Sequence, residues 1–463
     1  MDDLTPTLHQ RRGSIRADGH RDKVRVADVR GRFTTWRRWT FYVLILVYAA
    51  APLVKVGGKP LIFIDISNRR FFLFGQTFNA QDAYLLFFLL AGGILGIFLV
   101  TALLGRLWCG WACPQTVFLE GIFRPIERLL EGSSHEQLRL ARLPLRGRKL
   151  AILTVKHGLY LLAALLVSHI FISYFVSLEQ LRHWVLETPR EHWTAFLWMG
   201  SITGILYFNF AWFREQTCVI LCPYGRLQSA LTDDDTVVIG YDVRRGEPRG
   251  KAGTAGAGDC VDCLRCVEVC PTAIDIREGL QLECIGCANC IDACDDIMTR
   301  LERPIGLIRY DSFNGLAGRP KRWARPRVYL YVGILALLAG TGAVFAAARR
   351  PFEAMLIRQT GAPYVREEAE GIEVLRNQYF IHVINKTPRR STFTIQVAVP
   401  EGATAILPLP TIELDSLTDQ KLPLVVSMPE ERYEDLGSFD IAVTTRDEAT
   451  GATVTSQLRF LGP

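Results

Sequence analysis

The sequence lacks a glycine-rich dinucleotide fingerprint between a predicted strand and a predicted helix, so no dinucleotide cofactor is indicated. Its glycine-rich stretch, residues 253–258, is instead predicted to be a flexible lead into a cysteine-rich loop. The sequence also lacks a basic soluble face with interleaved aromatic side chains, and nucleic-acid binding is therefore not expected. The net charge of +6 comes largely from arginines beside long apolar runs, a distribution typical of membrane topology.

A further absence concerns residues 351–463, which contain no cysteine and therefore no supporting disulfide. Short β-rich stretches alternate there with turns at Asn385, at residues 400–402 and at Gly451. Regularly spaced short strands of this kind predict an immunoglobulin-like β-sandwich. Such a domain offers sheet surface for docking a partner but no evident chemistry.

Long apolar runs, by contrast, are abundant, and the mean hydropathy of +0.17 is unusual for a soluble protein. Segments of this length can cross a bilayer of roughly 30 Å as helices. We expect a helical transmembrane bundle of five spans, at approximately residues 39–56, 83–104, 150–176, 195–213 and 328–348. The first is expected to be an uncleaved anchor, because its charged lead-in is too long for a signal peptide.

Basic residues orient these spans. They cluster before the first span, after the second and before the fifth, and the positive-inside rule places all three regions in the cytoplasm. The odd number of spans then puts the C-terminal domain outside, in the periplasm of a Gram-negative host. Residues 1–36, which are basic and poor in apolar side chains, are predicted to be a disordered cytoplasmic tail.

The four spans within residues 37–225 look like a duplicated hairpin. The second and fourth each carry a glycine pair at helix-packing spacing and then run into an arginine and a Cys-x3-Cys-Pro motif. Because two matching features occur in matching order, a quasi-twofold four-helix bundle is predicted. The repeated features are Gly92/Gly96 and Gly200/Gly204, Arg106 and Arg214, and Cys109–Pro114 and Cys218–Pro223.

Eight of the twelve cysteines lie in residues 226–318, predicted to be a cytoplasmic ferredoxin-like domain. They form the bacterial ferredoxin run written twice, and in that pattern the fourth cysteine of each run ligates the other [4Fe–4S] cluster. One predicted ligand set is Cys260, Cys263, Cys266 and Cys294. The other is Cys270, Cys284, Cys287 and Cys290. Structural zinc lacks this eightfold regularity, and a disulfide framework does not suit a reducing compartment.

The remaining four cysteines, Cys109, Cys113, Cys218 and Cys222, are spaced i, i+4 within each motif. On a helix, each pair would share one face about 6 Å apart along the axis. Soft thiolates that converge near a bundle axis favour Cu(I), Zn(II) or an iron–sulfur centre, or could form a redox-active dithiol. The alternative is that they are small buried side chains at a helix interface.

Histidines are less informative. His157 and His169 lie on the third span, about 18 Å apart along a helix, which is too far for one metal or one haem. Core packing or a lipid interface is the expected environment for both. His183 and His192, each followed by a tryptophan, could bind a metal, but an interfacial aromatic belt explains them more simply.

The assembled pattern resembles the family of cytochrome c oxidase accessory proteins called CcoG, FixG or RdxA, which is related to the NapH-type membrane ferredoxins. The motifs that carry the resemblance are Trp108–Pro114 and Cys218–Arg226, and the C-terminal sandwich separates the chain from the NapH relatives. The match covers nearly the whole chain from about residue 36 onward. No cysteine departs from the family pattern.

The resemblance implies a bacterial inner-membrane protein that reduces Cu(II) to Cu(I) for assembly of a haem–copper oxidase of the cbb type. Cys109, Cys113, Cys218 and Cys222 would then serve the copper, and copper chaperones or transporters would be partners. Two alternatives stay open: a NapH-like quinol dehydrogenase, and a non-catalytic copper carrier or assembly scaffold. The sequence does not reveal the electron donor or whether the chain forms a homo-oligomer.

Overall fold

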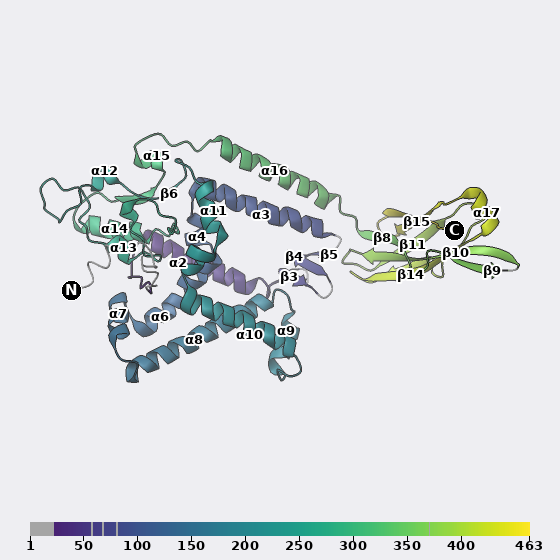
Figure 1. Cartoon of the computed structure of the whole chain (residues 1–463), viewed down its shortest axis with the longest axis horizontal. Helices are drawn as coiled ribbons and strands as arrows, with labels where there is room; N and C mark the ends of the chain where they lie inside the picture. Colours follow the sequence, from purple (N-terminus) through teal and green to yellow (C-terminus); the bar gives the residue numbers. More distant parts are fainter. Residues whose placement is uncertain (1–22, 57–58, 67–68, 80–81, 370) are drawn as a thin grey trace. The chain divides into compact units, whose positions relative to one another are not determined.

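The computed structural model describes residues 23–463 apart from residues 57–58, 67–68, 80–81 and 370. The chain divides into two compact units, which are described separately. One unit comprises the chain up to Gln76 together with Tyr84–Thr341. The other comprises Thr77–Ala83 together with Gly342–Pro463 (Figure 1).

Four helices are long and apolar enough to cross a membrane, which makes this a membrane protein. They are α3 (Ala83–Leu104), α8 (Gly147–Ile172), α10 (Trp193–Phe208, continued to Phe213 by the π-helical turn η3, Asn209–Phe213) and α16 (Pro326–Ala347). A short helix, α9 (Leu178–Leu186), joins α8 to α10. These four agree with four of the five predicted spans.

The first predicted span corresponds to α2 (Arg32–Ala50), which begins earlier than expected and falls outside the four candidate spans. Its N-terminal turn is polar and is held by a residue far away in the sequence. The backbone N–H and the hydroxyl of Thr34 each donate a hydrogen bond of 2.7 Å to Asp292. Arg37, one turn further on, is also buried.

The predicted tail of residues 1–36 needs correction. Residues 1–22 lie outside the described part, but residues 23–36 are ordered against the cysteine-rich domain. Val24 and Val26 pack on Ala273, and the N–H of Ala27 donates to the carbonyl oxygen of Glu268 at 2.9 Å. The apolar residues within this basic segment give it a surface to bury, which its overall composition does not show.

The expected bundle is only partly formed. Helices α8 and α10 lie side by side, and the hydroxyls of Ser168 and Thr203 hydrogen-bond between them at 2.7 Å (Figure 1). The glycine pairs, however, do not mediate helix packing. A Cβ at Gly92 would meet only Leu338 of α16, and one at Gly200 or Gly204 would meet nothing within 4 Å. Glycine spacing permits two helices to pack closely, but it does not specify which helix packs there.

Short elements fill the connections that the sequence analysis left as loops. After α3 come α4 (Leu107–Trp111), α5 (Pro114–Phe118), the π-helical turn η2 (Leu119–Phe123), α6 (Arg124–Glu131) and α7 (Ser134–Arg142). Before α3 lie β1 (Lys55–Val56), β2 (Lys59–Pro60), β3 (Ile62–Asp65), β4 (Arg70–Leu73) and β5 (Gln76–Asn79), the last three in one sheet. None of these strands was predicted.

The cysteine-rich domain is built as a repeat around one antiparallel strand pair, with Val238 of β6 opposite Asp311 of β7. Cys266 lies on α13, and Cys290 and Cys294 lie on α14. The domain's elements are α11 (Pro223–Leu231), β6 (Val238–Tyr241), α12 (Val243–Gly246), α13 (Arg265–Glu268), η5 (Ile276–Glu278), α14 (Asn289–Arg300), β7 (Ile308–Asp311) and α15 (Phe313–Leu316).

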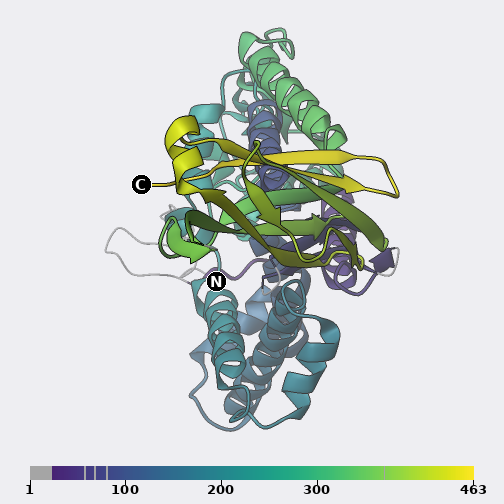
Figure 2. The same cartoon turned by 90° about the vertical axis from the view of Figure 1, so that its right-hand side faces the viewer.

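The second unit is a two-sheet sandwich, as predicted (Figure 2). Phe352, Phe393 and Phe460 are fully buried in its core. One sheet has the order β12-β14-β10-β8 with β9 paired to β10, and the other has the order β13-β11-β15-β16. The elements are β8 (Phe352–Arg358), β9 (Val365–Ala369), β10 (Ile372–Asn385), β11 (Ser391–Ala398), β12 (Thr404–Ile406), β13 (Thr411–Leu414), β14 (Asp419–Pro429), α17 (Glu430–Leu436), β15 (Asp440–Asp447) and β16 (Thr453–Arg459).

Candidate redox site

One cavity in the cysteine-rich domain carries all four thiols of one predicted ligand set. Its wall contains Cys270, Cys284, Cys287 and Cys290, together with Cys266 and apolar side chains that include Ile239, Ile274, Ile276 and Ile285. An enclosed, apolar-lined space with four thiols is the environment that an iron–sulfur cluster requires. The residues present therefore fit a [4Fe–4S] cluster at this place.

Backbone geometry supports the same conclusion. Gly286 (φ +67°) and Ala288 (φ +63°) adopt the left-handed conformation, which turns the chain tightly around the cavity. Burial raises the pKa of Cys284 to about 12, although the backbone N–H of Gly286 opposes the shift by hydrogen-bonding to the sulfur. Asp262 and Leu264 repeat these conformations in the first run, so the two runs share one fold.

The second predicted set also comes together. Burial raises the pKa of Cys294 to about 12, and the nearby Asp295, Cys260 and Cys263 add to the shift. Cys294 lies one helical turn beyond Cys290 on α14. The helix can therefore present one thiol to each set, which is how a ferredoxin run crosses between clusters.

The Cys-x3-Cys-Pro motifs differ from the prediction that each pair lies on one helix face. Helix α4 ends at Trp111, and Cys113 is extended (φ −62°, ψ 127°). The second motif has a π-helical turn, η4 (Thr217–Leu221), followed by an extended Cys222 (φ −73°, ψ 110°). A residue before proline is pushed out of the helical conformation, and proline suits the first turn of the next helix. The prolines thus begin new helices rather than end old ones.

The four thiols of these motifs are nevertheless neighbours. Burial raises the pKa of Cys218 to about 12, and the nearby Cys113, Cys109 and Cys222 add to the shift. The Gln228 amide donates a hydrogen bond of 3.3 Å to the sulfur of Cys109. Among the described residues, no three of these sulfurs lie within 4.8 Å of one another, so they do not form a closed shell for one ion.

The first motif lies directly against the loop that carries Cys284 and Cys287. A Cβ at Gly110 would lie 2.7 Å from the carbonyl oxygen of Ile285 and 2.9 Å from the backbone of Cys287. A Cβ at Gly286 would lie 3.0 Å from the carbonyl oxygen of Arg106. The two cysteine loops therefore touch through their backbones. The ferredoxin-like loop therefore folds back onto the first motif, which follows α3.

Two arginines join these loops. Arg106 donates to the carbonyl oxygen of Gly225, next to the second motif, at 2.6 Å. Arg37, only 3% exposed, donates to the carbonyl oxygen of Gly110 at 3.0 Å and to the side chain of Asn289 at 2.5 Å. From the sequence, the arginines before the first span were expected only to orient it, and this role of Arg37 was not predicted. The sequence around this arginine does not indicate its hydrogen-bond partners, which lie far away along the chain.

The contact at Gly110 leads to a testable expectation. Gly110→Ala should force the two cysteine loops apart, at a cost of about 1–3 kcal/mol for overpacking. Gly93→Ala is the matched control, because a Cβ at Gly93 of α3 meets nothing within 4 Å. Thermal unfolding and iron retention in detergent would be compared for both variants. Equal behaviour of the two variants would show that the close approach at Gly110 is absent.

A buried ion-pair network supports the second motif. Arg214 donates to Glu127 on α6 at 3.0 and 3.2 Å and to the hydroxyl of Tyr160 at 3.0 Å. Lys23 also pairs with Glu127. Lys156 of α8 faces the interior, where it pairs with Glu131.

Comparison with known proteins bears directly on the cysteine sites. A family model described as a 4Fe-4S binding domain matches residues 85–132, and one described as a 4Fe-4S dicluster domain matches residues 213–313. A third, described as the IG-like fold at the C-terminal of FixG, matches residues 343–463. The matches thus include both Cys-x3-Cys-Pro motifs, all eight ferredoxin-type cysteines and the sandwich.

Three curated proteins are similar over most of their length. RdxA of Cereibacter sphaeroides is 35% identical over 394 residues, which cover 82% of each chain. RdxB of the same organism is 35% identical over 81% of this chain and 82% of its own. The nitrogen fixation protein FixG of Rhizobium meliloti is 31% identical over 83% of this chain and 80% of its own.

A crystal structure of a FixG-related protein from Vibrio parahaemolyticus is also similar, at 18% identity and a TM-score of 0.21. It covers 24% of this chain and 97% of its own. The family assignment rests on the curated relatives and on the matched models. With identities of 31–35% over about four-fifths of both chains, the protein belongs to the FixG/RdxA family of iron–sulfur membrane proteins.

Proposed function

We propose that this protein reduces Cu(II) to Cu(I) and supplies Cu(I) for assembly of a cbb-type haem–copper cytochrome c oxidase. Each Cu(II) takes up one electron and no covalent bond to carbon changes, so the reaction needs only an electron source and a copper site. The observation that carries the proposal is the backbone contact between Gly110, inside the first motif, and the loop of Cys284 and Cys287. This contact supports the proposal, because it brings the loop of the first motif against a loop that carries predicted cluster ligands.

In this proposal, the eight ferredoxin-type cysteines hold two [4Fe–4S] clusters in the crossed sets predicted from the sequence. When bound, such clusters supply one-electron carriers. The chain contributes the thiolates, the backbone N–H of Gly286 beside Cys284, and an apolar wall that includes Ile239 and Ile285 and excludes water. Donors to sulfur and restricted solvent access are the usual means by which a protein adjusts the potential of such a centre.

The four motif cysteines receive copper as substrate. Thiolate sulfur is a soft donor that favours Cu(I) over harder ions, so the site stabilises the product of the one-electron step. Burial raises the pKa of Cys109 to about 11, which keeps it a thiol at neutral pH. Copper binding must therefore release protons, and affinity should rise with pH. In the described part of the chain, no three of these four sulfurs lie within 4.8 Å of one another. The two motif loops would therefore have to move closer together when the ion binds.

The arrangement also bears on membrane topology. Residues before α2 contact the cysteine-rich domain at Glu268, and the loop after α3 contacts the same domain at Cys287. Both ends of the segment from α2 to α3 are therefore on one side, and the segment must cross the membrane an even number of times. If α3 crosses once, α2 has to cross as well, which gives five spans in total.

With five spans, the cysteine loops and the N-terminus lie on one side and the sandwich on the other. The basic residues assign the cysteine side to the cytoplasm of a bacterial inner membrane, and the sandwich then lies in the periplasm. There it would dock an oxidase-assembly copper chaperone or transporter. Accessibility of single introduced cysteines to an impermeant reagent in intact cells would test this topology.

A second candidate function is favoured by a cavity beside Cys284. The cavity lies where α3 ends and where Arg106 and Gln228 meet the cysteine loop. Its lining is largely apolar, with Leu104, Leu282 and Tyr310 among the wall residues. An apolar cavity with a few polar groups suits a quinol head group, so the chain could be a NapH-like quinol dehydrogenase. Quinol oxidation that does not depend on copper would favour this candidate.

The copper proposal is tested by removing one motif at a time. Cys109→Ser/Cys113→Ser and Cys218→Ser/Cys222→Ser should each abolish Cu(I) formation, because all four thiols serve one site. Protein reduced anaerobically and freed of excess reductant would be mixed with Cu(II) and a Cu(I)-specific chromophore. Half activity in each pair variant would indicate two independent sites. Full activity in both would overturn the assignment of these cysteines to copper.

The third alternative, a copper carrier without catalysis, is distinguished in the same experiment. A carrier would bind Cu(I) tightly through the motif thiols but would form no Cu(I) from Cu(II). Iron content serves as the control for intact centres. If the chain holds two clusters, the parent and both pair variants should each contain about eight iron atoms per chain. A parent with about twelve, falling to about eight in the variants, would show that the motif cysteines hold a third cluster instead.

A further inference from the structure

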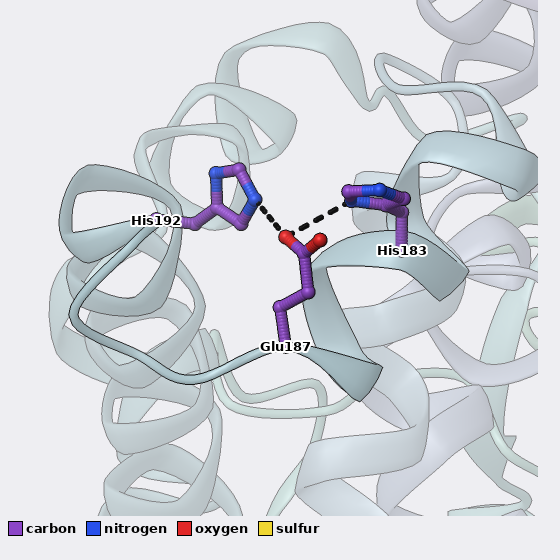
Figure 3. Close-up of side chains that lie close together, drawn as sticks. All are labelled: His183, Glu187 and His192. Atoms are coloured by element: carbon purple, nitrogen blue, oxygen red, sulfur yellow. Dashed lines mark hydrogen bonds and ion pairs between the residues drawn. The ribbon is translucent and has the colours of Figure 1, made fainter.

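Two histidines and a glutamate converge at the end of α10 that is remote from the cysteine motifs. His183 lies on α9, Glu187 directly follows that helix, and His192 is the residue that precedes α10 (Figure 3). Among the described residues, this is the one group in which three His, Cys, Asp or Glu ligand atoms lie within 4.8 Å of one another. We propose that these residues bind one divalent transition-metal ion, with Cu(II) bound most tightly.

The local fold explains how the three side chains meet. His183 and Glu187 are four residues apart at the C-terminal end of α9, so they lie on one face of the helix. The chain then leaves the helix at Glu187 (φ −91°, ψ 170°) and returns within five residues to His192. This tight connection brings the His192 ring back over the helix end.

One nitrogen of each histidine points at the same carboxylate oxygen of Glu187. The Nδ1 atom of His183 is 3.0 Å from the Oε2 atom of Glu187, and the Nε2 atom of His192 pairs with the same oxygen. The two imidazole rings are 6.0 Å apart, and the Trp184 ring packs against His192 at 5.8 Å. Packing of this kind fixes the orientation of a ligand ring before an ion arrives.

The donor set selects the class of ion. Two imidazole nitrogens and one carboxylate oxygen suit Zn(II), Cu(II) and Ni(II), whereas Ca(II) and Mg(II) prefer oxygen donors and Cu(I) prefers sulfur. For a given nitrogen and oxygen site, the Irving–Williams order places Cu(II) above the other divalent ions. Three protein ligands leave positions for water, so a bound ion would be exchangeable rather than structural.

Hydrogen bonds alone are a weaker explanation of this geometry. Without a metal, both rings would donate N–H groups to one oxygen of Glu187, which requires a particular tautomer of each histidine. The side chains of His183, Glu187 and His192 are 65%, 31% and 31% exposed, so such bonds compete with water and add little stability. The same exposure lets an ion reach the site from solution.

The sequence analysis favoured an aromatic belt over a metal site for these histidines. Trp184 and Trp193 do contribute aromatic side chains here, but Trp184 lies against His192 rather than apart from it. The metal proposal does not depend on the cupric reductase function, because the three ligands are separate from every cysteine. On the proposed topology, it lies on the side opposite the cysteines.

The test uses Cu(II) itself as the probe, with full-length protein purified by a tag that contains no histidine. The background is the variant in which Cys109, Cys113, Cys218 and Cys222 are all changed to Ser, so that these thiols neither bind nor reduce Cu(II). With the iron–sulfur centres oxidised, equilibrium dialysis and the Cu(II) electron paramagnetic resonance spectrum would be recorded. We expect one tight Cu(II) per chain with hyperfine splitting from two nitrogens.

Single changes then identify the ligands. His183→Ala and His192→Ala should each weaken Cu(II) binding by at least about 100-fold, since loss of a supporting partner alone costs 10–100-fold. Glu187→Gln should weaken binding while keeping the side-chain shape. The matched control is His382→Ala in the sandwich, where a histidine pairs with Asp419 at 2.7 Å and has no third ligand among the described residues.

The proposal is overturned if the background protein binds no tight Cu(II), or if binding persists in His192→Ala. Equal loss in His382→Ala would also overturn it, because the ion would then lie elsewhere. The four motif cysteines are absent throughout, so failure here leaves the cupric reductase function untouched. Conversely, a positive result does not require that function.

Discussion

Replacing Glu127 by glutamine is expected to destabilise the protein by about 3–5 kcal/mol, because it leaves a buried cation without its counter-charge. Arg214 is 2% exposed, and its two terminal guanidinium nitrogens both donate to Glu127. Its backbone (φ +50°) is in the left-handed region, which a non-glycine residue adopts only when its surroundings hold it there. Loss of the pair should loosen the second motif as well as lower overall stability.

The ion pair between Arg214 and Glu127 predicts that the stability of the protein depends on pH. Although burial alone would raise it, Arg214 and Lys23 hold the pKa of Glu127 well below its usual range. A carboxylate whose pKa is depressed in the folded state contributes stability that is present above its unfolded pKa. That contribution is lost as the pH falls through the folded pKa. Wild-type stability should therefore decline from about pH 4.5 downward more steeply than that of Glu127→Gln.

Thermal unfolding in detergent measures the loss, and the rate of alkylation of Cys218 reports on the motif. Asp296→Asn is the matched control, since Asp296 forms an exposed i, i+4 pair with Arg300. Such exposed pairs contribute about 0–1 kcal/mol, so this variant should be close to wild type. Similar midpoints for the two variants, or unchanged alkylation of Cys218, would contradict the supporting role of Glu127.

Double substitutions in the cysteine-rich domain should show which thiols share a cluster. Cys263→Ala/Cys294→Ala removes two ligands of one proposed cluster and should retain about four of about eight iron atoms. Cys290→Ala/Cys294→Ala removes one ligand from each and should lose nearly all of the iron. The two variants change the same number of cysteines, and Cys294 is common to both, so each is the control for the other.

The opposite pattern of iron loss would show that the ligands are not crossed between the two runs. If each run of four cysteines held its own cluster, Cys290→Ala/Cys294→Ala would retain half of the iron and Cys263→Ala/Cys294→Ala would lose nearly all of it. The structure favours the crossed arrangement, because Cys270 lines the cavity of Cys284, Cys287 and Cys290. Cys294 instead lies near Cys260 and Cys263, which add to the burial that raises its pKa. Iron analysis and the spectrum of the reduced protein would decide between the two.

The sequence was most informative where chemistry constrains local spacing. The two ferredoxin runs require particular residues at particular intervals, and Cys270, Cys284, Cys287 and Cys290 line one cavity in the structure. The apolar runs of α3, α8, α10 and α16 were equally clear, since membrane spans need long uninterrupted segments. The C-terminal strands alternated enough for the sandwich to be predicted, although not its sheet order.

The sequence was least informative where distant segments meet. Nothing in the local pattern indicated that Asp292 caps α2 or that Arg37 reaches Asn289. The i, i+4 spacing of the motif cysteines suggested a helix face, but the following prolines keep Cys113 and Cys222 extended. Short-range spacing thus predicted the ligands but not the shape of the loop that carries them.

The histidine cluster is a related case. Each histidine on its own looked like part of an interfacial belt, because both are followed by tryptophan. Only the turn after α9, which returns His192 to Glu187, brings three ligand atoms together. A sequence with two separated His-Trp pairs does not reveal that turn.

The central claim is that electrons held by this protein reach copper at the motif cysteines. The most direct measurement is an anaerobic titration of fully reduced protein with Cu(II), with Cu(I) counted by a chromophore. Two clusters of one electron each predict about two Cu(I) per chain for wild type. The variant with Cys109, Cys113, Cys218 and Cys222 all changed to Ser should give none above the blank. An equal yield from that variant would contradict the account.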